Sequence, residues 1–170
     1  MKPLSRLWIS AFFSCFFLQA ASQAGYRYAG AYGGDYYQHS YFGGLFLDIA
    51  REDHGAYSFF VEGRRYHRSL PVLSKETTEV REEHYAILGG VAYKKILLRR
   101  KNNSFRFLLA ATAGTTAGTF VVGPQAGLEF THSFAGGWEL LLQPRGGYLF
   151  RAPGKNGYAG LGAGIRLPVN

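Results

Sequence analysis

Residues 158–167 read YAGLGAGIRL, and this stretch decides the fold class. Side chains on a β-strand alternate between two faces, and here one face is apolar while the other holds only glycine and arginine. The apolar positions are Ala159, Leu161, Ala163, Ile165 and Leu167, and the opposite positions are Gly160, Gly162, Gly164 and Arg166. A strand with lipid outside and a narrow lumen inside has this pattern. The stretch therefore predicts one strand of a transmembrane β-barrel.

The same alternation recurs along the chain, and no segment after residue 24 shows a clean apolar stripe of helical period. The further strands that it predicts cover residues 26–32, 43–49, 57–64, 84–93, 105–113, 120–130 and 138–151, the first being the weakest. The 12 Tyr, 14 Phe and 23 Gly residues are typical of aromatic belts at two membrane interfaces and of close strand packing. We predict an all-β fold, a membrane-embedded, antiparallel, up-and-down β-barrel of about eight strands.

A transmembrane helix is the alternative between Arg106 and Glu129, because about twenty uncharged residues are enough to cross a bilayer. The spacings Gly114/Gly118 and Gly123/Gly127 match a helix-packing motif. The segment is nevertheless rich in glycine and threonine and contains a proline, so it is weakly hydrophobic and poor in helix formers. Two strands joined by a turn within 114–118 are the favoured interpretation.

The first residues have the three parts of a secretory signal peptide. Lys2 and Arg6 make a basic start, residues 7–18 form an apolar run without charge, and small residues surround a cleavage site after Ala24. This predicts a signal peptide over 1–24, a barrel domain over 25–170 and residence in the outer membrane. An uncleaved anchor helix would need a longer apolar run. Cys15 lies inside the run rather than after it, which disfavours lipidation.

The predicted connections differ in length at the two ends of the barrel. If the first strand starts in the periplasm, the periplasmic links are residues 52–55, 97–104 and 135–137. The longest and most charged link, residues 69–81, then lies outside the cell, as does the short link 115–118. Short periplasmic turns and longer outer loops are the usual asymmetry of outer-membrane barrels.

Several charged residues alternate with the apolar face and are predicted to point into the lumen. This predicted lumen charge network consists of Asp48, Glu62, Arg64, Arg106, Glu129, Glu139, Arg145 and Arg166, with Gln125 and Gln143 beside it. An eight-stranded barrel is only wide enough to be filled by its own side chains, so we expect ion pairs that plug the interior. A wet path for protons or solutes is the alternative. We further expect Glu139 and Arg145 to be energetically coupled.

The residues that could support catalysis form no prearranged set. The best candidate set is Ser40 as nucleophile and His39 as base, with Asp35 nearby in the sequence. The second candidate set is Ser133 with His132. Neighbours on a strand point to opposite faces, so neither pair is placed for proton transfer. The five His residues lack ligand spacing within one element, and no basic run is interleaved with stacking aromatics. We therefore predict no enzyme activity, no metal, no cofactor and no direct binding of nucleic acid.

Four segments, in order, resemble the conjugal transfer protein TraO family. They are GAYSFFVEGRRYHRSLPV (55–72), HYAILGGVAYKKIL (84–97), FVVGPQAGLEFTHSF (120–134) and WELLLQPRGGYLF (138–150), and the resemblance covers residues 43–167. It implies a non-catalytic outer-membrane component of a conjugative DNA-transfer apparatus, in contact with outer-membrane lipid and other apparatus proteins. The family has no catalytic motif to carry over. A lipid-modifying barrel enzyme and a generic surface-binding barrel are the alternative functions.

Overall fold

The computed structural model describes residues 27–36, 40–51, 55–69, 81–152 and 156–169, and it is an antiparallel barrel. The predicted signal peptide, its cleavage site after Ala24 and most of the link 69–81 lie outside the described residues. The eight strands are β1 (Arg27–Tyr36), β2 (Ser40–Ala50), β3 (Gly55–Ser69), β4 (Arg81–Arg100), β5 (Asn103–Thr116), β6 (Thr119–Ser133), β7 (Glu139–Tyr148) and β8 (Gly157–Val169). The predicted fold class and strand number are confirmed.

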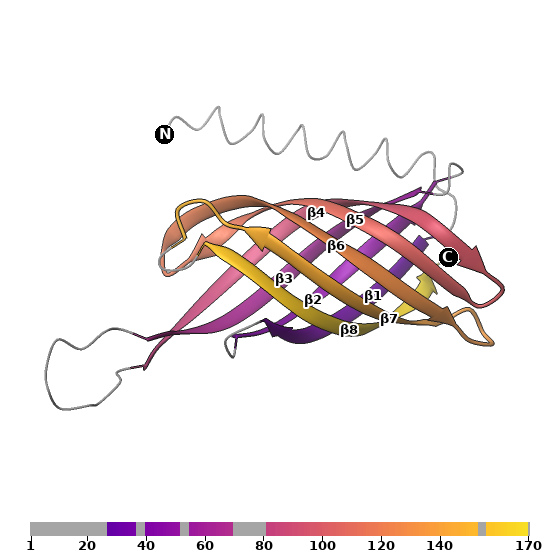
Figure 1. The fold of residues 1–170 in the computed structure, drawn as a ribbon, viewed down its shortest axis with the longest axis horizontal. Helices are drawn as coiled ribbons and strands as arrows, with labels where there is room; N and C mark the ends of the chain where they lie inside the picture. The colour runs from indigo at the N-terminus through magenta and orange to yellow at the C-terminus, as the bar shows by residue number, and fades with distance from the viewer. Residues whose placement is uncertain (1–26, 37–39, 52–54, 70–80, 153–155, 170) are drawn as a thin grey trace, which may run out of the picture.

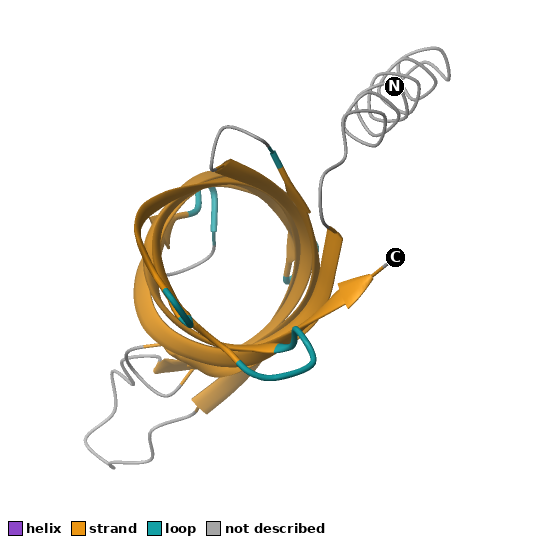
Figure 2. Ribbon diagram, turned by 90° about the vertical axis from the view of Figure 1, so that its right-hand side faces the viewer, coloured by secondary structure: helices purple, strands orange, loops and turns teal. Residues whose placement is uncertain are grey.

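Each strand pairs with its neighbour in sequence, and β8 pairs with β1 to close the barrel. Arg27 faces Val169 at one end of this closing seam, and Tyr36 faces Gly160 at the other. Figure 1 shows the strands running obliquely around the barrel, and Figure 2, a view close to its axis, shows the closed ring. A closed sheet leaves no strand edge with unpaired backbone groups, as a spanning structure requires.

The barrel has two different ends. At one end of the barrel, the turn end, β2 leads into β3, β4 into β5 and β6 into β7, and Arg27 and Val169 lie at this end as well. At the other end, the loop end, β1 leads into β2, β3 into β4, β5 into β6 and β7 into β8. Ala117 and Gly118 form a two-residue turn with φ of 46° and 76°, as the favoured hairpin turn requires. The predicted links 97–104 and 115–118 are therefore shorter in the structure, because β4 and β5 extend almost to their turns.

Two irregularities interrupt the ladders. In β4, Ile96 faces Arg106 and Leu98 faces Phe105, so Leu97 is the extra residue of a β-bulge. Between β6 and β7, the register breaks off between Gly127 and Phe130, opposite a stretch that contains Pro144. Proline has no N–H to donate to a ladder, which accounts for the break.

The uncharged stretch between Arg106 and Glu129 belongs to β5 and β6. The alternative of a transmembrane helix is therefore wrong, because the turn at Ala117 and Gly118 splits the stretch into paired strands. Within the described part of the chain, no helix has the length and apolar character needed to cross a membrane.

Candidate functional site

The outer surface of the barrel is apolar. Leu45 and Ile87 are 68% and 63% exposed, and Phe120 is 64% exposed. Large exposed side chains of this kind occur on every strand from β2 to β8. The buried charged side chains of these strands lie on the opposite face, which lines the lumen. Soluble monomers rarely expose large apolar side chains on so many adjacent strands. The barrel is thus apolar outside and polar inside, the arrangement that lipid selects.

Aromatic side chains flank this surface at both ends. At the turn end Phe134 stacks on Trp138 with ring centroids 4.0 Å apart, and at the loop end Tyr148 meets Phe150 at 5.1 Å. From Trp138 to Tyr148 the chain advances by ten residues, along the length of β7. A strand of that length, tilted by about 40°, rises about 26 Å along the barrel axis, close to the thickness of the apolar band in outer-membrane barrels.

The Glu62 cluster, made of Tyr32, Tyr36, Glu62, Arg64 and Arg145, fills the lumen toward the loop end. The hydroxyls of Tyr32 and Tyr36 each donate a hydrogen bond of 2.9 Å to the Glu62 carboxylate. Arg64 and Arg145 form ion pairs with the same carboxylate. The Arg64 guanidinium also lies 4.0 Å from the ring centroid of Tyr158, and that of Arg145 lies 4.1 Å from the ring of Phe42. The buried charges are therefore both paired and stacked on aromatic faces.

The Glu129 cluster, made of Asp48, Lys94, Arg106, Glu129, Glu139 and Arg166, fills the lumen toward the turn end. Lys94 bridges Asp48 at 2.9 Å and Glu129 at 2.8 Å. Arg166 contacts Asp48 at 2.9 Å, and its Nε donates to Glu139 at 2.8 Å. The cluster holds three cations and three carboxylates drawn from β2, β4, β5, β6, β7 and β8, so it ties most of the barrel wall together.

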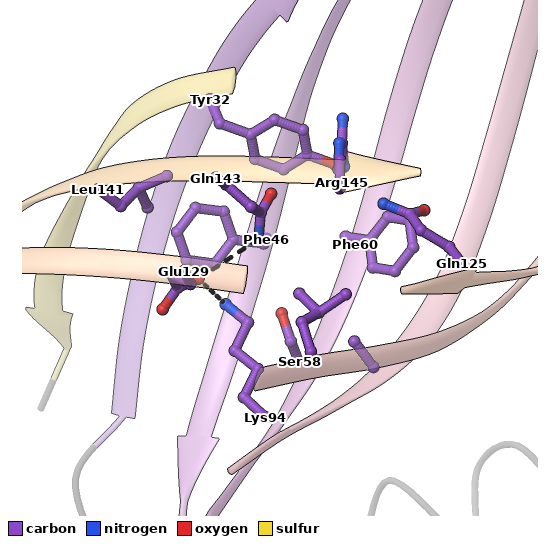
Figure 3. A pocket seen from close by; sticks show the side chains of 12 residues that line it. Tyr32, Phe46, Ser58, Phe60, Lys94, Gln125, Glu129, Leu141, Gln143 and Arg145 are labelled. Carbon is purple, nitrogen blue, oxygen red and sulfur yellow. Dashed lines mark hydrogen bonds and ion pairs between the residues drawn. The ribbon is translucent and has the colours of Figure 1, made fainter. Parts of the chain in front are cut away.

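An apolar layer separates the two clusters. Phe46 of β2 and Phe60 of β3 lie opposite each other. Along β3 the next inward residue toward the loop end is Glu62, and along β2 the next inward residue toward the turn end is Asp48. Leu108 and Leu141 are buried in the same layer. The cavity beside it, drawn in Figure 3, has a volume of about 20 Å³, room for roughly one water molecule. The middle of the lumen is filled by side chains.

The structure places all eight residues of the predicted lumen charge network inside the barrel and brings them into these two clusters. Seven of them are buried and Arg106 is half-buried, with 13% of its side chain exposed. Gln143 donates to Glu129 at 3.4 Å, and Gln125 accepts from Tyr158 at the same distance.

One expected pairing is wrong. Arg145 pairs with Glu62 across the lumen, whereas Glu139 pairs with Arg166. Arg145 and Glu139 lie on the same face of β7 but at different heights, because six residues along a strand cover about 20 Å. Sharing a strand face was therefore insufficient to make them partners.

Sequence reasoning missed three members of the clusters. Lys94 lay beyond the predicted end of its strand, and Tyr32 and Tyr36 belong to the strand with the weakest pattern. Lys94 continues the inward series of Ala86, Leu88 and Ala92, so extending the alternation by one step would have found it.

Of the two candidate pairs of nucleophile and base, only Ser133 with His132 lies wholly within the described residues, and there each side chain has a different partner. Ser133 donates to Glu139 at 3.0 Å, while Nδ1 of its neighbour His132 lies 2.7 Å from Asn103. His39, the partner expected for Ser40, lies outside the described residues. No group of three metal-ligating side chains comes together in the described ranges.

Comparison with solved structures shows a likeness of fold. A solved structure described as "De novo design of transmembrane beta-barrels" superposes with a TM-score of 0.54 at 10% identity, covering 86% of this chain and 97% of that one. No family model matches the sequence. No curated protein matches it either. The likeness concerns the fold, which is that of a transmembrane β-barrel.

Proposed function

We propose that this barrel resides in the outer membrane as a non-catalytic structural and interaction component of a conjugative DNA-transfer apparatus. The main support for a location in a membrane is that the barrel is apolar outside and charged inside, the reverse of a soluble protein. Leu45, Ile87 and Phe120 are exposed on its outer surface. Glu62, Glu129 and Arg166 are fully buried in its lumen. Closed barrels are the form in which strands cross a bilayer, and the basic, apolar and small-residue parts of residues 1–24 support export.

The filled lumen supports a structural role over transport or catalysis. Two ion-paired clusters and the layer of Phe46 and Phe60 occupy the space where a channel would run. The surfaces with which such a barrel can contact partner proteins are then its two rims and its loops. Contact with other proteins of the apparatus, and with outer-membrane lipid, follows from this placement.

The role in DNA transfer rests on the resemblance of residues 43–167 to the TraO family. Deleting the coding sequence in its native host should lower the frequency of conjugative transfer, and a wild-type copy should restore it. A double variant, His39→Ala with Ser40→Ala, should restore transfer equally well, because the proposal assigns no nucleophile. Unchanged transfer after deletion would refute the role, and failure of the double variant at normal protein level would revive a catalytic function.

The location is tested separately. Membrane fractionation should recover the protein with the outer membrane, and N-terminal sequencing should begin at Gly25. The expected cause is cleavage after Ala24 followed by insertion of the strands. Recovery with the inner membrane and an intact Met1 would contradict both statements while leaving the barrel fold untouched.

A further inference from the structure

A cavity of about 330 Å³ opens at the turn end of the barrel, next to the Glu129 cluster. Among the described residues that line it, seven are basic and two are acidic. The acidic residues, Asp48 and Glu139, are already engaged in ion pairs. The wall of this vestibule, as we call the cavity, therefore has a large excess of positive charge.

The excess belongs to the mouth of the vestibule rather than to its floor. In the Glu129 cluster below it, three cations balance three carboxylates. The mouth adds Arg99, Arg100 and Lys101, which are exposed and form no ion pair with any residue that the structure describes. Uncompensated cations gathered around one cavity raise the local concentration of anions.

The β-bulge at Leu97 directs one of these cations toward the lumen. Residues directly opposite in an antiparallel ladder share a face, and Arg99 lies opposite the buried Ser104. Without the extra residue, Leu98 would take that position and Arg99 would point outward. Bulges commonly re-aim a side chain beside a functional site.

The floor also offers a donor. Nε of Arg106 is buried and has no hydrogen-bond partner among the described residues, and its contact with Glu129 is long, at 3.5 Å. A buried guanidinium donor without an acceptor is costly, and an anion in the vestibule would supply one.

We propose that the vestibule binds a multivalent oxyanion of the phosphate class, such as a diphosphate group. Its volume lies at the lower end of small-ligand pockets, which span roughly 300–1,000 Å³. Guanidinium forks match phosphate oxygens in geometry, and several positive charges favour a ligand with more than one negative charge. The diphosphate group belongs either to a soluble compound or to the head group of a lipid that reaches the rim. The inference goes beyond a role in DNA transfer and does not depend on it.

The test is calorimetric titration of the purified protein in a neutral detergent with inorganic pyrophosphate. Binding should saturate at one ion per barrel, and Arg99→Gln should raise the dissociation constant about tenfold, the usual effect of losing a charged hydrogen bond. Lys101→Gln should also weaken binding. Arg151→Gln is the matched control, because Arg151 is an exposed arginine at the loop end whose loss changes net charge equally.

Absence of saturable binding by the wild type would overturn the proposal. An equal weakening by Arg99→Gln and Arg151→Gln would also overturn it, since general attraction to a basic protein would then explain the data. Repeating the titration in phosphatidylcholine discs with and without cardiolipin, a lipid whose head group carries two phosphates, distinguishes the sources. Competition by the anionic lipid identifies a head group as the occupant, and unchanged binding identifies a soluble anion.

Discussion

At the scale of single residues, the carboxylate of Glu62 joins β1, β3 and β7 at one point. It accepts hydrogen bonds from the hydroxyls of Tyr32 and Tyr36 and pairs with Arg64 and Arg145. A fully buried charge is tolerated only when its oxygens are satisfied in this way. The same carboxylate therefore compensates two buried guanidinium groups at once.

Replacing Glu62 with Gln should lower the free energy of unfolding in detergent by about 3–5 kcal/mol, because two buried cations lose their counter-charge. Adding Arg145→Met should recover part of the loss, since one of the stranded cations is then removed. Equilibrium unfolding in guanidinium chloride measures both. The matched pair is Glu139→Gln with Arg145→Met, whose effects should simply add, because the two residues belong to different clusters. Coupling in that pair, and none with Glu62, would contradict the assignment.

The inward positions of the charged residues could be predicted from the sequence, but their partners could not. Alternation tells which face of a strand a side chain takes, and this placed Arg145 and Arg166 in the lumen. Which charges meet depends on the stagger of strands around the barrel, and that stagger brings β7 to β3 across the lumen. Lys94 was missed because Lys95 follows it, and two adjacent lysines resemble the end of a strand.

At the scale of elements, glycines on the inner face let neighbouring strands and rings approach closely. A Cβ added to Gly164 would lie 2.3 Å from the carbonyl oxygen of Ala31 and 2.8 Å from Cα of Tyr32, both backbone atoms of β1. A Cβ added to the outward Gly43 would have nothing nearer than 3.7 Å. The closing seam between β1 and β8 thus depends on the absence of a side chain at Gly164.

Gly164→Ala should therefore destabilise the barrel by about 1–3 kcal/mol, the usual range for overpacking, while Gly43→Ala should leave stability nearly unchanged. Heat-modifiable migration in gels reports the effect, because a weakened barrel unfolds at a lower temperature of incubation. Equal unfolding temperatures for the two variants would show that the seam between β1 and β8 accommodates a methyl group at residue 164, against the short distances found there.

All eight strands could be located from the period-two pattern, and their ends could not. β4 runs to Arg100 and β1 to Tyr36, well beyond the predicted limits. Backbone pairing with a neighbour continues past the last clear alternation, because ladder hydrogen bonds do not depend on side-chain polarity. The bulge at Leu97 and the break near Pro144 are likewise properties of a pair of strands, so neither strand alone reveals them.

At the scale of the whole molecule, filling of the lumen decides what can pass through it. The protein inserted into planar bilayers should leave conductance at background, because two ion-paired clusters and an apolar layer occupy the axis. An open porin inserted by the same procedure provides the positive control. Stable single-channel steps from the wild type would show a continuous water path and would remove the argument for a plugged barrel.

Closure of β1 against β8 also dictates when the barrel can fold. Arg27 and Val169 become neighbours only in the finished ring, so the longest loop in the chain must be closed for the last ladder to form. Before β8 has been synthesised and exported, the first seven strands can form only a sheet with two edges whose backbone groups are unpaired. Such an intermediate invites pairing with other chains. Until β8 is available to pair with β1, the chain is therefore exposed to such pairing.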